Sequence, residues 1–68
     1  MDIQELKSLL KPGDLVTVQT PMFQGDGVVF AIFPKERFPI QLELTQPDGD
    51  GHAMKRVAWA EIKFWQPN

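Results

Sequence analysis

Apolar and polar residues alternate most regularly from position 39 to position 59, and this stretch predicts a β-hairpin. Ile40, Leu42 and Leu44 are separated by polar residues, which is the two-residue period of a strand with one buried face. A Pro-Asp-Gly-Asp-Gly segment follows, and its composition favours a turn before a second strand returns over residues 53–59. The hairpin is typical of small antiparallel β domains.

The pairing of the two hairpin strands follows from their apolar residues. If Leu42 lies opposite Val57, then Ile40 lies opposite Trp59, and we assign all four residues to the core. A slip by one residue would turn Arg56 towards the core, so the pattern specifies which face of each strand is buried.

Residues 2–10 predict a short helix ahead of the strands. Its apolar residues share one face at helical spacing: Ile3, Leu6, Leu9 and Leu10. Asp2 and Glu5 have the spacing of a capping box, and Pro12 with Gly13 ends the helix. A helix of about nine residues is marginal alone, so we expect it to dock on the sheet.

Two strands are predicted between the helix and the hairpin. Residues 14–20 form the first, with Val16 and Val18 facing inward. Residues 28–33, VVFAIF, form the second, which is apolar on both faces and is therefore expected to be central or bent. The loop at 21–27 contains two glycines, which we expect to permit positive φ.

The last residues, AEIKFWQPN, predict a tight turn of 3₁₀ type and a short final strand. We expect Ile62 and Phe64 to pack inside. Because successive side chains on a strand point to opposite faces, Trp65 is then expected at the surface or rim.

One helix and five short strands predict a mainly β fold, a small barrel formed by residues 14–65 of a single domain spanning residues 1–68. The segments KPGDLVTV (11–18) and GDGVV (25–29) resemble the opening of small Src-homology-3-like (SH3-like) barrels, including the KOW-type modules of transcription and ribosomal proteins. The segment VAWAEI (57–62) resembles the 3₁₀ turn before their last strand. The resemblance covers about half of the chain and implies an SH3-like fold and a nucleic-acid or ribosome-associated role.

Composition narrows the picture further. A chain of 68 residues without cysteine has no disulfide framework and no thiolate metal cage, and its core is expected to depend on five Phe, two Trp and the aliphatic residues. No apolar run reaches the ~18 residues of a membrane span, and the N-terminus lacks a signal-peptide pattern. We therefore expect a cytoplasmic protein without a membrane partner.

Catalysis is not expected. The chain has one His, no Cys and no Tyr, and its one serine, Ser8, lies in the predicted helix with no base nearby in sequence. No phosphate-binding loop of Walker type occurs. A small barrel also offers little depth for a substrate pocket of roughly 300 Å³ or more, so we expect neither enzymatic activity nor a cofactor.

A metal site at the acidic turn is also not expected. Asp48, Asp50 and His52 alternate along the chain, but an EF-hand loop would need Gly and Glu where Ala53 and Trp59 stand. We interpret the segment as a solvated acidic turn.

Two binding functions remain. The first is a protein-interaction module for an unidentified protein or a second copy, with Phe23, Phe38 and Trp65 as contact residues and Lys35 and Arg37 as rim charges.

The alternative is nucleic-acid binding, in which cations would contact phosphates and aromatic rings would stack on bases. The candidate cations are Lys35, Arg37, Lys55, Arg56 and Lys63. The net charge of −2 and the absence of cations from residues 22–27 weigh against this function. Two observations test these hypotheses: cations scattered over several faces would weaken nucleic-acid binding, and burial of Trp65 and Phe23 would weaken protein binding through those residues.

Overall fold

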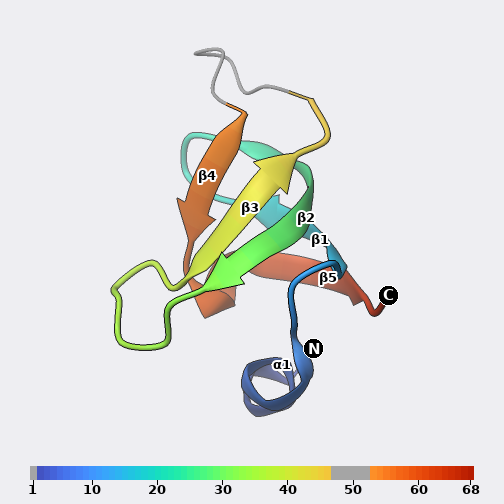
Figure 1. Ribbon diagram of the computed structural model, residues 1–68. Coiled ribbons are helices and arrows are strands. Elements are labelled where there is room, and N and C mark those ends of the chain that lie inside the picture. The colour runs from blue at the N-terminus through green and yellow to red at the C-terminus, as the bar shows by residue number, and fades with distance from the viewer. Residues whose placement is uncertain (1, 47–52) are drawn as a thin grey trace.

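The computed structural model describes residues 2–46 and 53–68, and within them the chain is mainly β. Five antiparallel strands form one curved sheet in the order β4-β3-β2-β1-β5 (Figure 1). The elements are α1 (Ile3–Leu9), β1 (Leu15–Gln19), β2 (Gln24–Ile32), β3 (Ile40–Leu44), β4 (Met54–Val57), the 3₁₀ helix η1 (Trp59–Glu61) and β5 (Ile62–Gln66). The four strands β1 to β4 form a meander, and β5 returns to pair with β1.

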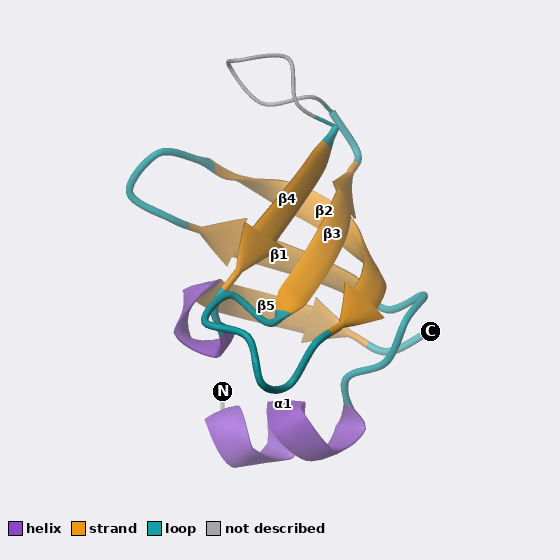
Figure 2. Ribbon diagram, turned by 60° about the vertical axis from the view of Figure 1, so that its left-hand side comes forward, coloured by secondary structure: helices purple, strands orange, loops and turns teal. Residues whose placement is uncertain are grey.

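The predicted N-terminal helix is present and docks below the strands (Figure 2). Asp2 caps it by accepting a hydrogen bond from Gln4 N at 2.9 Å, rather than from the amide of Glu5 as a capping box would require. Leu6 and Leu10 are buried. Only part of the predicted apolar stripe therefore packs, and the rest of it stays exposed.

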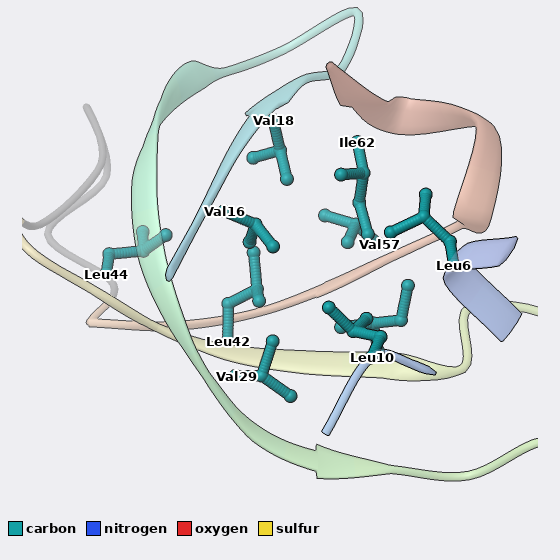
Figure 3. Close-up of a cluster of buried hydrophobic side chains, with 10 residues drawn as sticks. Leu6, Leu10, Val16, Val18, Val29, Leu42, Leu44, Val57 and Ile62 are labelled. Carbon is teal, nitrogen blue, oxygen red and sulfur yellow. The ribbon is translucent and has the colours of Figure 1, made fainter. Parts of the chain in front are cut away.

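The core is aliphatic. Its buried hydrophobic residues in the described part of the chain are Leu6, Leu10, Val16, Val18, Val29, Ile40, Leu42, Leu44, Val57 and Ile62 (Figure 3). Phe23, Trp59 and Trp65 pack against this cluster but stay partly exposed. The expectation that phenylalanine supplies the core is therefore wrong, because four of the five Phe residues are exposed.

Strand β2 begins earlier than the sequence predicts and takes in two glycines that were expected in a loop. Among the described residues, only Gly13 has positive φ, at 98°. A Cβ atom on Gly27 would lie 3.2 Å from both the Glu43 carbonyl oxygen and the Leu42 Cβ. Glycine suits position 27 because β3 passes close to the backbone and would crowd a Cβ atom, and a left-handed turn is not involved.

The β3–β4 hairpin is confirmed, but its register differs from the predicted one by two residues. Val57 pairs with Ile40, and Lys55 pairs with Leu42. An even shift keeps the same face inward, so the inward-facing aliphatic residues are buried as predicted. Trp59 is not in a paired strand, because the chain leaves β4 after Val57 and Trp59 begins η1.

A bulge between β1 and β5 reverses the predicted orientation of two aromatic residues. Ile62 pairs with Val18 and Phe64 pairs with Thr17, so the register shifts by one residue between these pairs. Ile62 is buried as predicted, whereas Phe64 is 58% exposed. The extra residue turns Phe64 to the outer face and leaves Trp65 half-buried against the core.

Candidate interaction surfaces

Two of the exposed phenylalanines lie on the outer face of the sheet. Phe30 on β2 and Phe64 on β5 expose 59% and 58% of their surface. Val28 on β2 lies directly opposite Leu15 on β1. Phe64 lies opposite Thr17, two residues along β1, and is therefore a diagonal neighbour of Leu15. Diagonal neighbours on adjacent strands are about 7–8 Å apart, within reach of aromatic side chains. We call Leu15, Val28, Phe30 and Phe64 the outer-face band.

Phe30 faces outward because it follows the buried Val29, and a bulge at Phe30 turns the next residue, Ala31, outward as well. Val29 pairs with Leu42 and Ala31 pairs with Gln41, which leaves Phe30 without a residue opposite it on β3. Such an extra residue bends the strand and re-aims its side chains. The apolar residues on both faces of this strand are thereby divided between the core and the outer-face band.

A second group, the Arg–Phe cluster, consists of Phe33, Arg37, Phe38 and Arg56. The guanidinium carbon of Arg56 lies 4.6 Å from the centroid of the Phe33 ring, and Arg56 Nε donates a hydrogen bond to the Phe38 carbonyl oxygen at 2.8 Å. Arg37 lies 5.9 Å from the centroid of the Phe38 ring. Each arginine is therefore within cation–π distance of an aromatic ring.

Backbone hydrogen bonds hold the loop that carries most of this cluster. The loop connects β2 to β3, near the end of β4 (Figure 2). Phe33 N donates to the Pro39 carbonyl oxygen at 2.7 Å, and Glu36 N donates to the Phe33 carbonyl oxygen at 2.9 Å. Pro34 and the buried Pro39 restrict φ at both ends. These hydrogen bonds close the loop and hold its backbone in a turn, on which Lys35 and its neighbours are exposed.

The residues predicted to contact a protein fall into two environments. Phe38, Lys35 and Arg37 are exposed in the β2–β3 loop. Phe23 and Trp65 are half-buried and pack against the core. The first three therefore belong to one accessible surface, and the other two take part in packing.

The cations of the nucleic-acid hypothesis are divided between several surfaces. Lys35 and Arg37 lie in the β2–β3 loop, and Arg56 contacts that loop from β4. Lys55 points to the opposite side of β4, because neighbouring strand residues alternate. Lys63 lies on β5. Arg37 and Arg56 therefore belong to the Arg–Phe cluster and Lys35 lies in the same loop, whereas Lys55 and Lys63 lie elsewhere.

Asp14 is the one buried charged residue in the described part of the chain. Its Oδ2 accepts hydrogen bonds from Lys11 N and Trp65 Nε1, each at 3.0 Å. Its Oδ1 accepts from Lys11 Nζ at 3.0 Å and from Asn68 N at 2.9 Å. Burial alone would raise the pKa of Asp14, but the hydrogen bonds outweigh it and hold the pKa well below its usual range. The hydrogen bond from the Trp65 indole to Asp14 therefore links β5 to the residue that precedes β1.

The described residues contain neither a cluster of metal ligands nor a membrane-spanning helix. Within residues 2–46 and 53–68, no three His, Asp or Glu side chains lie close enough to hold a metal ion. No helix there is long and apolar enough to cross a membrane. The alternating residues Asp48, Asp50 and His52 lie outside the described residues.

Three exposed aromatic residues were not predicted as contacts from the sequence: Phe30, Phe33 and Phe64. The run VVFAIF signals Phe30, because a strand apolar on both faces must expose one face unless something covers it. Phe64 has no such local signal, since its orientation depends on the β1–β5 bulge. No protein-family model, curated protein or solved structure matches this chain, so its function must be inferred from these surfaces.

Proposed function

We propose that this chain is a non-enzymatic β domain that binds another protein through the outer-face band. One observation carries the proposal: four of the five phenylalanines are exposed around a core built from Leu, Val and Ile. Burying an aromatic side chain removes about 150–250 Å² from water, and a small domain has few other means of stabilisation. Aromatic residues left outside are well suited to an interface, where they carry much of the binding energy.

We also propose that the curved sheet is a small SH3-like barrel. The strand order, with β5 returning to pair with β1, supports this assignment. The 3₁₀ helix between β4 and β5 supports it too, because it occupies the segment that resembles the 3₁₀ turn of such barrels. Such a barrel would hold β1, β2 and β5, which carry the outer-face band, in a fixed arrangement.

Nucleic-acid binding is the second candidate, and one observation favours it. Two of its five candidate cations, Arg37 and Arg56, lie beside exposed aromatic rings in the Arg–Phe cluster, and Lys35 lies in the same loop. A strand bound there would have few phosphate contacts, and a modest increase in salt would weaken such binding. Protein binding remains the better-supported function because the exposed apolar surface extends well beyond these cations.

Affinity capture from the source cell tests the proposed function. Tagged wild-type chain is compared with Phe30→Ser and Phe64→Ser, and with Leu9→Ser as a matched control, since Leu9 is 53% exposed on α1. We expect a discrete protein that is captured by wild type and Leu9→Ser and is lost with either band variant. Equal capture by all four chains, or recovery of RNA in place of protein, would contradict the proposal.

A further inference from the structure

The Arg–Phe cluster carries a charge opposite to that of the whole chain. Lys35, Arg37 and Arg56 bring three cations to this region, and Glu36 is the one acidic residue of the connecting loop. The chain as a whole has a net charge of −2. A local cationic patch on an acidic chain attracts negatively charged segments and orients them on approach.

The cluster adjoins one end of the outer-face band. On the outer side of the sheet, Ala31 lies opposite Gln41, and Gln41 lies opposite Arg56. Phe30 directly precedes Ala31 and, as the extra residue of the β2 bulge, lies on the same outer side. A partner segment that crosses the Arg–Phe cluster can therefore continue onto the band without leaving this face.

Arg56 is held in place before any partner arrives. The Phe33 ring supports its guanidinium group at 4.6 Å, and the bond from Nε to the Phe38 carbonyl oxygen fixes its orientation at 2.8 Å. These contacts reduce the conformational entropy that an arginine loses on binding. The Nε bond leaves the two terminal amino groups to face an incoming carboxylate in the paired geometry that arginine favours.

We propose that the Arg–Phe cluster binds an extended segment of the partner in which acidic and apolar residues are mixed. Carboxylates pair with Arg37 and Arg56, and an apolar side chain rests on the exposed rings of Phe33 and Phe38. This inference rests on the proposed function, because it names the class of segment that the partner supplies.

A peptide fits this surface better than a longer polyanion does. Glu43 lies on the same outer face, two residues along β3 from Gln41. Asp26 also lies on this face, hydrogen-bonded to Thr17. A nucleic-acid strand that continued past the three cations would meet these carboxylates, whereas a short acidic segment ends before them.

An NMR titration of the isotope-labelled full chain tests the inference. The probe is a short synthetic peptide in which Glu alternates with Phe and Leu, and the matched control peptide carries Gln in place of Glu. A single-stranded oligouridine is titrated alongside. We expect saturable shifts of amides in residues 33–39 and in β4 with the acidic peptide, and much weaker shifts with the other two probes.

Substitutions identify the residues responsible. We expect Arg37→Gln and Arg56→Gln each to weaken acidic-peptide binding about tenfold, which corresponds to about 1.4 kcal/mol, and Lys63→Gln to leave it unchanged. Arg37→Gln serves as the second test if Arg56→Gln disturbs the loop. Equal binding of the Gln peptide, tighter binding of oligouridine, or unchanged binding in both arginine variants would overturn the inference.

The two proposals can fail separately. Capture of a protein that depends on Phe30 and Phe64, without binding of the acidic peptide, would reject the acidic segment and leave the outer-face band in place. Binding of the acidic peptide without any such capture would reject the band.

Discussion

Asp14→Asn removes a negative charge from the centre of a hydrogen-bonded junction while keeping the size of the side chain. Each carboxylate oxygen accepts two hydrogen bonds. The four donors are the backbone and side chain of Lys11, the Trp65 indole and the Asn68 backbone amide. An asparagine places an NH₂ group where one oxygen was. Whichever oxygen the NH₂ group replaces, the two donors that bonded to that oxygen then face another donor and lose their acceptor.

The size of the effect depends on which donors lose their acceptor. A buried donor without a partner costs about 1–3 kcal/mol. Lys11 Nζ can turn to water, because its side chain is 56% exposed, so the asparagine is expected to place its NH₂ group on that side. With the loss of charge included, we expect unfolding to become easier by about 2–4 kcal/mol, a large share of the ~5 kcal/mol that a small domain holds.

The pH dependence supplies a second readout. The pKa of Asp14 is lower in the folded chain than in the unfolded chain, where it is about 3.9. Its contribution to stability is therefore fully present above about pH 4 and is lost as the pH falls below that value. Wild type should lose stability more steeply than Asp14→Asn does in this acidic range.

Urea unfolding followed by circular dichroism measures these differences. Asp26→Asn is the matched control, because Asp26 is an exposed carboxylate that accepts one hydrogen bond, from Thr17 Oγ1 at 2.6 Å, and we expect its cost to stay below about 1 kcal/mol. Equal losses for the two variants at neutral pH, or the same acid dependence in wild type and Asp14→Asn, would show that the buried Asp14 carboxylate does not stabilise the fold.

Three further substitutions test the packing, each by urea unfolding. Leu42→Ala should cost about 2–5 kcal/mol because Leu42 is fully buried in the core, and a loss under about 1 kcal/mol would reject the assigned inner face. Phe64→Ser should cost less than about 1 kcal/mol, since this ring is mostly exposed; a loss comparable to that of Leu42→Ala would place Phe64 in the core. Gly27→Ala should cost about 1–3 kcal/mol because its Cβ would press on β3, and an unchanged midpoint would show that the strands can separate without penalty.

Local alternation was a reliable guide where the strands are regular. Val16 and Val18 in β1, and Ile40 and Leu42 in β3, are buried as predicted. These strands keep a two-residue period over their whole length, so the apolar positions alone determine the inward face. The helix and the 3₁₀ turn were also predictable, because their sequence signals are local.

The failures in side-chain orientation and strand register concern pairings between strands, which the local sequence does not specify. The β1–β5 bulge reversed the orientations predicted for Phe64 and Trp65, and nothing in the residues around Phe64 specifies that bulge. Gly27 was assigned to a loop because its need for glycine arises from Leu42 on another strand. The hairpin register was wrong by an even number of residues, which alternation cannot detect.

The candidate surfaces were predictable only in part. Lys35, Arg37 and Phe38 stand in a charged loop between two prolines, and exposure there follows from local composition. That Arg56 contacts this loop depends on the β3–β4 register. The outer-face band combines residues from three strands, so its continuity required the pairing of those strands.

Site-specific photocrosslinking is the most direct test of protein binding by the outer-face band. A photoreactive phenylalanine analogue is placed at position 30 in the outer-face band, and in a matched chain at position 9, which is also exposed but lies on α1. We predict a discrete protein adduct from position 30 that Phe64→Ser weakens, and no such adduct from position 9. The same adducts from both positions, or adducts to nucleic acid from position 30, would rule out specific protein binding through the outer-face band.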